Sequence, residues 1–326
     1  MYFRTIVKIP DYPISISYSD ALLVFGSCFA ENIGQKLLEN KFDACVNPFG
    51  ILYNPMSIKS SLDNLLDEKI YTGEDLIFYE GLYHSFSHHG KFSSPDRETC
   101  LNNINGALQN AREYLKKARF LIITFGTAYV YRLKESGKIA ANCHKLPDNR
   151  FERTRLNIND IENAYRELIG RLKNNHPEMN IIFTVSPIRH WKDGAHENQL
   201  SKSTLLLAVD TLQHAYENVH YFPSYEIVMD ELRDYRFYAE DMNHISDVAV
   251  SYIRDRFFES LLSSEAKEFI EQWTKIRKAL NHVPFNAESE QYKLFIRKNT
   301  DALIRLKAAF PNLNIENELN GLQQKI

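Results

Sequence analysis

The stretch LLVFGSCFAENIGQKL, residues 22–37, decides the fold of this chain. Four apolar residues lead into Gly26, Ser27 and Cys28, and apolar residues then recur at helical steps, which is typical of a strand that turns directly into a helix. In an open parallel sheet, ligands bind outside the carboxyl ends of the strands. A thiol at a helix start also loses its proton more easily, because it lies at the positive end of the helix dipole. Cys28 is therefore either a nucleophile at a sheet edge or a small buried residue at a helix start.

Further apolar runs alternate with helical patterns over the first two-thirds of the chain. Strands are predicted at residues 21–25, 42–46, 120–125, 181–185 and 220–222. Helices are predicted at residues 29–40, 95–118, 158–175, 197–218 and 246–262. This alternation is typical of parallel strands joined by crossover helices. It predicts an α/β fold, a three-layer sandwich around a five-stranded parallel sheet.

Two insertions and a helical tail complete the pattern. Hairpins are predicted at residues 77–79 with 82–86, and at 128–133 with 138–141, near the carboxyl edge of the sheet, where they would shape a pocket. Beyond residue 263 only helices are predicted, at 265–280 and 290–310, with Pro311 ending the second. We therefore expect one domain over residues 1–262 and a helical C-terminal extension over residues 263–326.

Composition excludes several classes of protein. The chain has 326 residues and a net charge of -3, with scattered lysines and arginines, so we expect no nucleic-acid partner. No run approaches the roughly 18 apolar residues of a membrane span, and the N-terminus lacks the pattern of a signal peptide. We expect a cytoplasmic protein without membrane association. The four cysteines lack CxxC spacing and are expected to be thiols. Oligomeric state has no indication in the sequence.

A second polar motif lies far along the chain, in YAEDMNHIS, residues 238–246. An aspartate three residues before a histidine can hold the imidazole Nδ1–H and leave Nε2 free as a base. Asp241 and His244 have this spacing, just ahead of the last predicted crossover helix. The alternative is a surface turn with a capping aspartate.

A nucleophile after the first strand and an Asp-x-x-His after the last resemble the SGNH (GDSL) hydrolase superfamily. More closely, the chain resembles the GSCFA-domain family, over residues 22 to 244. The motifs that carry this resemblance are FGSCFAENIG (25–34), NPFGILYNP (47–55), TFGTAYVYR (124–132), ANCHK (141–145), SPIRHWKDG (186–194), ENQLSKSTL (197–205), YFPSYEI (221–227) and DMNH (241–244). The resemblance implies an enzyme-like fold without fixing a reaction.

The resemblance also implies roles for the two motifs. Laid over the Gly-Asp-Ser motif of the superfamily, Ser27 falls on the aspartate and Cys28 on the nucleophilic serine. The catalytic residues are then Cys28 as nucleophile, His244 as base and Asp241 as the residue that orients it. If the overlay slips by one position, Ser27 attacks and Cys28 packs beneath the helix.

The oxyanion donors depart from the superfamily pattern. Its Gly-x-Asn motif matches Gly126 and Thr127, but Ala128 stands where the asparagine belongs. Another donor must then serve, and Asn142 and His144 are the best candidates, because an amide and an imidazole can both donate to a developing oxyanion.

Other polar residues are expected near the same sheet edge. Ser186, Arg189 and His190 follow a predicted strand, and Arg189 has the geometry to bind a carboxylate or phosphate in bidentate fashion, although an ordinary surface turn is the alternative. Gly50 follows the second strand, where its N–H is a candidate second oxyanion donor, and Lys145 is a candidate partner for an anionic substrate.

We therefore predict an ester hydrolase (esterase) or O-acyltransferase that acts through a covalent acyl-enzyme on a small-molecule or carbohydrate ester or thioester. No cofactor is expected, and acyl-CoA is a candidate co-substrate. The main alternative is a non-catalytic module that binds a ligand on the same scaffold, which the missing asparagine favours. A metal-dependent hydrolase using His84, His88 and His89 is the third hypothesis. His84 and His88 have the spacing of one helix face, but the surrounding turn residues argue against a helix, and no metal site is predicted.

Overall fold

A five-stranded parallel sheet forms the centre of the molecule, in a computed structural model that describes residues 4–325. Its strands, in spatial order, are β10 (Val219–Tyr221), β9 (Asn180–Val185), β5 (Ala118–Phe125), β1 (Ala21–Gly26) and β2 (Ala44–Val46). From β1 the chain first adds β2 on one side and then crosses back to add β5, β9 and β10 on the other. The order therefore reverses between β1 and β5, which is where open α/β sheets bind their ligands.

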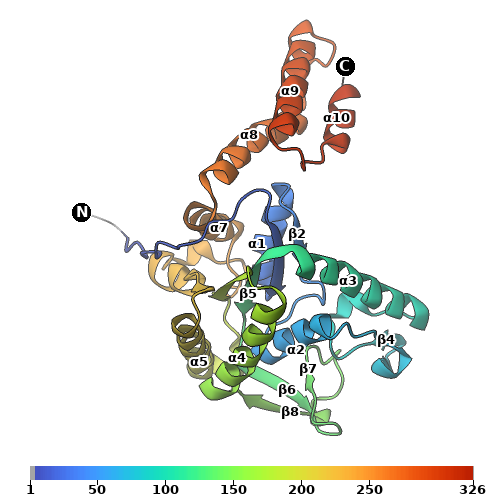
Figure 1. The fold of residues 1–326 in the computed structure, drawn as a ribbon, viewed down its shortest axis with the longest axis vertical. Helices are drawn as coiled ribbons and strands as arrows, with labels where there is room; N and C mark the ends of the chain where they lie inside the picture. Colours follow the sequence, from blue (N-terminus) through green and yellow to red (C-terminus); the bar gives the residue numbers. More distant parts are fainter. Residues whose placement is uncertain (1–3, 326) are drawn as a thin grey trace.

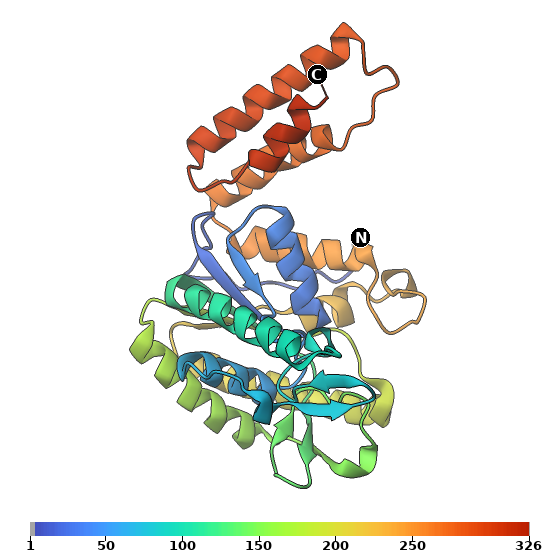
Figure 2. The same ribbon diagram turned by 90° about the vertical axis from the view of Figure 1, so that its right-hand side faces the viewer.

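Helices cover both faces of this sheet and confirm the predicted three-layer α/β sandwich (Figures 1 and 2). Side chains of β1 alternate between the two cores, because successive residues of a strand point to opposite faces: Leu22 and Val24 enter one, and Leu23 and Phe25 the other. The first core is covered by α1 (Cys28–Glu39) and α7 (Asp247–Leu261). The second is covered by α2 (Pro55–Leu66), α3 (Arg97–Lys117), α4 (Ile158–Asn175) and α5 (Gly194–Ala215).

Both predicted hairpins are present, and each differs in detail from the expectation. The first pairs β3 (Ile77–Tyr79) with β4 (Leu82–His84). The second pairs β6 (Tyr129–Leu133) with β7 (Ile139–Ala140), and gains a third strand, β8 (Phe151–Arg155), on the other side of β6. Strand β8 has no apolar alternation in the sequence, since only Phe151 in it is buried. Its pairing with β6 decides its structure.

Helix α2 was not predicted either, although its signals are local. Asn54 caps it by accepting the Ser57 N–H at 2.8 Å, and Pro55 occupies its first position. Its buried Ile58, Leu62 and Leu65 recur at helical spacing. The remaining short elements are η1 (Gly73–Asp75), η2 (Gly90–Phe92), η3 (Asp148–Arg150), η4 (Trp191–Asp193), α6 (Ser224–Glu226), η5 (Ile227–Glu231) and η6 (Tyr235–Phe237).

Three C-terminal helices extend from the end of the molecule opposite the hairpins, as Figures 1 and 2 show. They are α8 (Ser264–Leu280), α9 (Glu290–Ala309) and α10 (Glu316–Gln323). Their apolar residues continue the core beneath α1 and α7, where the ring of Tyr18 lies 3.8 Å from that of Phe269 and 5.1 Å from that of Phe310. The chain passes from α7 into α8 between Leu261 and Ser264, where the domain boundary is predicted.

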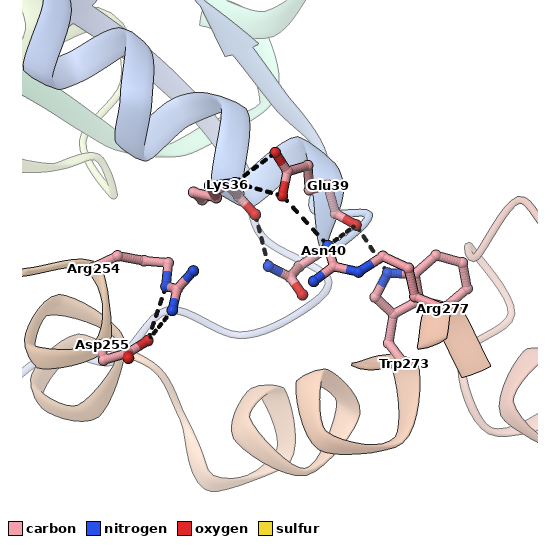
Figure 3. A network of polar contacts seen from close by, with 7 residues as sticks. All are labelled: Lys36, Glu39, Asn40, Arg254, Asp255, Trp273 and Arg277. Carbon is pink, nitrogen blue, oxygen red and sulfur yellow. Dashed lines mark hydrogen bonds and ion pairs between the residues drawn. The ribbon is translucent and has the colours of Figure 1, made fainter. Parts of the chain in front are cut away.

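Polar contacts also hold the C-terminal helices against the last turn of α1 (Figure 3). The indole N–H of Trp273 donates to the Glu39 carbonyl at 2.9 Å, and Arg277 pairs with the Glu39 carboxylate at 3.4 Å. Because Cys28 begins α1 and Glu39 ends it, these contacts lie about 17 Å from Cys28 along the helix. In the described part of the chain no helix has the length and apolarity needed to cross a bilayer.

Candidate active site

The turn after β1 requires a glycine. Gly26 has φ of 143°, and a Cβ there would lie 2.3 Å from the Thr124 carbonyl oxygen on the neighbouring strand. Its N–H donates to Asn47 Oδ1 at 2.8 Å, and its carbonyl accepts the Leu52 N–H at 2.9 Å. The loop after β2 therefore holds the end of β1 in place.

Ser27 and Cys28 have different environments at the start of α1. Ser27 is the N-cap, only 2% exposed, and its hydroxyl oxygen accepts the Phe29 N–H at 3.3 Å. Cys28 is the first helical residue and is half-buried at the wall of a cavity. Its N–H, one of the donors that a helix start leaves free, makes no hydrogen bond within residues 4–325.

The cavity beside Cys28, which we call the main cavity, has a volume of about 540 Å³. It lies at the carboxyl edge of the sheet, and its walls come from the ends of β1, β5 and β9, the second hairpin and the loop before α7. Its polar and sulfur-bearing lining residues are Ser27, Cys28, Tyr53, Thr127, Tyr129, Tyr131, Asn142, Cys143, Lys145, Asp148, Arg153, Ser186, Arg189, His190, Trp191, Lys192, Asn243 and His244.

The loop before α7 carries the aspartate and histidine to this cavity as a bonded pair. His244 Nδ1 donates to Asp241 Oδ2 at 2.5 Å, and Asp241 Oδ1 accepts the N–H groups of Asn243 and His244 at 3.0 and 2.9 Å. The hydrogen bond from His244 is the main cause that lowers the pKa of Asp241 to about 2, so this carboxylate stays ionised. Nε2 of His244 makes no hydrogen bond within the described chain, which leaves it available as a proton acceptor.

Tyr53 was not singled out from the sequence, yet its hydroxyl lies 3.6 Å from the Cys28 sulfur. Burial, and after it the neighbouring Cys28, raises the pKa of Tyr53 above its ordinary value, so the hydroxyl keeps its proton and can donate it in a hydrogen bond. The Tyr53 carbonyl accepts the N–H groups of Gly126 and Thr127 at 2.7 and 3.0 Å. The NPFGILYNP motif contains Tyr53, but nothing in its spacing indicates this contact.

Lys202 is a second residue that sequence reasoning missed. It is fully buried on α5, and its Nζ donates to the carbonyls of Gly126 at 2.6 Å and Ser186 at 2.7 Å, at the ends of β5 and β9. Burial, and after it the charge of Arg189, lowers the pKa of Lys202 to about 7. Lys202 thus joins two strand ends that support the main cavity.

The predicted substrate-binding residues Thr127, Asn142, Ser186, Arg189 and His190 all line the main cavity. Asn142 Oδ1 accepts the His144 N–H at 2.8 Å, which leaves the amide N–H₂ group free to donate. Ser186 Oγ accepts the Ile188 N–H at 3.3 Å and is a local turn residue. Burial, and after it the charge of Lys202, lowers the pKa of His190 to about 4, so its ring is neutral near pH 7.

Three predicted donors are already engaged elsewhere and do not line the main cavity. The Gly50 N–H donates to the Asn47 carbonyl at 2.7 Å, and the Gly126 N–H donates to Tyr53, as described above. His144 packs against the first hairpin, where its Nε2 is 2.8 Å from the Ser85 carbonyl and its ring centroid is 4.5 Å from that of His84.

The histidine-rich hairpin has a packing role in the structure. His88 is fully buried, stacks on Phe49 with ring centroids 4.8 Å apart, and bonds Ser85 Oγ at 2.9 Å. Burial is the main cause that lowers its pKa to about 3. Over residues 4–325, no three His, Cys, Asp or Glu residues come together in an arrangement that could hold a metal ion.

Residues 21–257 match the model of the GSCFA family. The chain belongs to the GSCFA family. Residues 273–326 match the model described as GSCFA domain protein, C-terminal domain, which corresponds to most of the α8–α10 segment. No curated protein matches the chain.

Proposed function

We propose that this GSCFA protein is an SGNH-like ester hydrolase or O-acyltransferase that works through an acyl-enzyme on Cys28. The observation that carries the proposal is that Cys28 and His244 line the same cavity, although more than 200 positions separate them in the chain, and that Asp241 is hydrogen-bonded to His244. A thiol, an imidazole with one free nitrogen and a carboxylate that orients it are the parts of a nucleophilic triad.

The reaction proceeds in two steps on these groups. The Cys28 sulfur attacks the carbonyl carbon of the ester or thioester, its proton passes to Nε2 of His244, and the bond to the leaving group breaks as that group takes the proton. In the second step His244 removes a proton from water or from an acceptor hydroxyl, which attacks the thioester on Cys28 and restores the thiol. Asp241 keeps the imidazole in the required tautomer and stabilises its charged form.

Three donors are available for the oxyanion of each tetrahedral intermediate. They are the free N–H of Cys28, the Tyr53 hydroxyl beside the sulfur and the amide group of Asn142 on the opposite hairpin. Donors of this kind stabilise the negative charge that develops on the carbonyl oxygen. They take the place of the asparagine that the superfamily pattern would put at Ala128, which is fully buried and donates its N–H to Ser201.

The test is acylation of Cys28 itself. The protein is incubated with acetyl-CoA, and the Cys28 peptide is examined by mass spectrometry for an added acetyl group. We expect the wild type to form the adduct and His244→Ala to form it much more slowly. In Cys28→Ala the peptide that contains position 28 should carry no acetyl group. Absence of any adduct with acetyl-CoA and with simple activated esters would reject the acyl-enzyme.

The second candidate function is a binding module without catalysis. Two observations favour it: the side chain of His244 is about half exposed, and Ala128 replaces the expected asparagine donor. Such a module would bind a ligand in the main cavity with equal affinity in the wild type and in His244→Ala, and would form no adduct on Cys28.

A further inference from the structure

Arg189 is a half-buried cation without a counter-ion. It belongs to the wall of the main cavity, and its one polar contact is between Nη2 and the Met229 sulfur at 3.3 Å. No carboxylate lies within ion-pair distance of it in residues 4–325. Arg153, on the same cavity, is different, because both of its terminal nitrogens bond the Asp193 carboxylate.

A second cleft adjoins the main cavity and shares Arg189 and Trp191 with it. This second cleft has a volume of about 370 Å³ and is also lined by Met229, Arg233, Tyr235 and Tyr238. Trp191 is 50% exposed and Tyr235 is 75% exposed, so both residues are accessible to a ligand at this cleft.

The charge of the second cleft is positive. Arg233 is exposed and, like Arg189, has no carboxylate within ion-pair distance among the described residues. The one carboxylate of the cleft, Asp234, is engaged locally: it accepts the Arg236 N–H at 3.0 Å and pairs with the Arg236 guanidinium at 3.5 Å. Two guanidinium groups are therefore free to meet an anion.

These features favour one ligand chemistry. A partly buried charge is costly unless it is paired, so Arg189 gains a partner if an anion binds beside it. Guanidinium groups bind phosphate through two parallel hydrogen bonds, and aromatic faces bind flat rings and apolar chains. Because Arg189 and Trp191 line both the main cavity and the second cleft, the two are adjacent, and an extended molecule that passes these side chains would reach both.

We propose that the second cleft binds the phosphate-bearing part of an extended acyl donor, held by Arg189 and Arg233, while its thioester carbonyl lies beside Cys28. The proposal rests on the proposed function for the position of the reacting carbonyl. The acyl group passes from the donor sulfur to the Cys28 sulfur, and the donor leaves as a thiol with the proton relayed by His244, so no other reactant is needed.

Phosphate binding can be measured without catalysis, through tryptophan fluorescence. The chain has two tryptophans: Trp191 lines the second cleft, whereas Trp273 is 2% exposed among the C-terminal helices. Titration with inorganic pyrophosphate at low salt should give a saturable change that Trp191→Phe removes. We expect Arg189→Gln and Arg233→Gln each to weaken the binding at least tenfold.

Arg119→Gln is the matched control. Arg119 is an exposed arginine and the second residue of β5, so it lies at the amino end of the strand, whereas both cavities lie at the carboxyl ends of the strands. It should bind pyrophosphate as the wild type does. Equal affinity in Arg189→Gln, Arg233→Gln and Arg119→Gln, or no saturable change in the wild type, would overturn the phosphate site.

A second comparison identifies the source of the phosphate. Acetyl-CoA and acetyl-N-acetylcysteamine carry the same thioester, but only the first carries phosphates. We expect acetyl-CoA to acylate Cys28 at least tenfold faster, and Arg189→Gln to bring the ratio of the two rates close to one.

The outcomes separate this inference from the proposed function. If the two thioesters acylate Cys28 at equal rates and pyrophosphate binding depends on Arg189, the second cleft binds phosphate from another source, and the claim that it binds the acyl donor is overturned. If adducts form with acetyl-CoA at the same rate in the wild type and in Arg189→Gln, the inference is overturned and the proposed function is not. If pyrophosphate binding depends on Arg189 but no adduct forms on Cys28, the proposed acyl-enzyme is overturned, and so is the claim that the second cleft binds an acyl donor.

Discussion

The Tyr53 hydroxyl lies 3.6 Å from the Cys28 sulfur, and this contact joins the loop before α2 to the first residue of α1. A half-buried phenol that keeps its proton can donate a hydrogen bond first to the thiolate and then to the oxyanion that forms when the thiolate attacks. The Tyr53 hydroxyl is therefore placed to stabilise the oxyanion that forms when the Cys28 sulfur attacks.

Tyr53→Phe should slow acylation of Cys28 about tenfold or more, because it removes one oxyanion donor and keeps the ring that packs edge-on against His190 at 5.7 Å. The rate of adduct formation measures this. Tyr129→Phe is the control, since that hydroxyl lines the same cavity but donates to Glu197 at 2.7 Å. Equal losses in the two variants would contradict a special role for Tyr53.

Cys28 should react with iodoacetamide at least tenfold faster than Cys143 near neutral pH. Both thiols are half-buried on the main cavity, but burial is the main cause that raises the pKa of Cys143 to about 11. Burial likewise raises the pKa of Cys45 to about 11 and raises that of Cys100. Mass spectrometry of the four peptides over time gives the rates, and His244→Ala should slow only the Cys28 peptide. Similar rates for Cys28 and Cys143 would argue against an activated thiol.

Ser27→Ala should lower the free energy of unfolding by about 1 kcal/mol, because it removes the side chain that caps α1. Its rate of acylation should stay within tenfold of the wild type. Cys28→Ala should instead lose on the order of 10³-fold in any turnover that is found. Denaturant unfolding and the adduct assay measure the two effects. An inactive Ser27→Ala together with an active Cys28→Ala would assign the attack to Ser27.

Lys202 should make stability depend on pH in a window that one variant can isolate. Its pKa is about 7 in the folded protein, below the ordinary value of about 10.4 expected after unfolding. Between these values the unfolded chain binds more protons, so the cost of the buried lysine is complete below pH 7 and declines as the pH rises. The free energy of unfolding should therefore rise from pH 7 to 8.5, by at most ~1.4 kcal/mol per pH unit from this group.

Lys202→Met should reduce that slope, whatever its effect on stability at a single pH. Denaturant unfolding at several pH values compares the two slopes. The other titrating groups are common to both proteins, so the difference between the slopes reports on Lys202. Identical slopes in the wild type and the variant would show that Lys202 does not titrate in this range.

Most of the sheet could be predicted because its signals are local. Leu22, Leu23, Val24 and Phe25 form an unbroken apolar run because their side chains enter two cores in alternation. Such a run is the sequence signal of a parallel strand that is buried on both faces. Gly26 indicated the turn. Strand β8 could not be predicted, because it is a strand only through its pairing with β6.

The sequence by itself determined the α/β class, the five strands of the central sheet, the strand-to-helix turn at Cys28 and the spacing that bonds Asp241 to His244. Each of these depends on residues within a few positions of one another, where backbone periodicity and hydrogen-bond reach decide the outcome.

Only the tertiary structure decided which groups remain free at the carboxyl edge of the sheet. It engages the N–H of Gly126 with the carbonyl of Tyr53, places His144 against the first hairpin and leaves Arg189 without a carboxylate partner within residues 4–325. It also brings Tyr53 to the sulfur of Cys28. The physical reason is that a donor or a charge is free only when no neighbour in space satisfies it, and those neighbours come from parts of the chain that no local pattern relates.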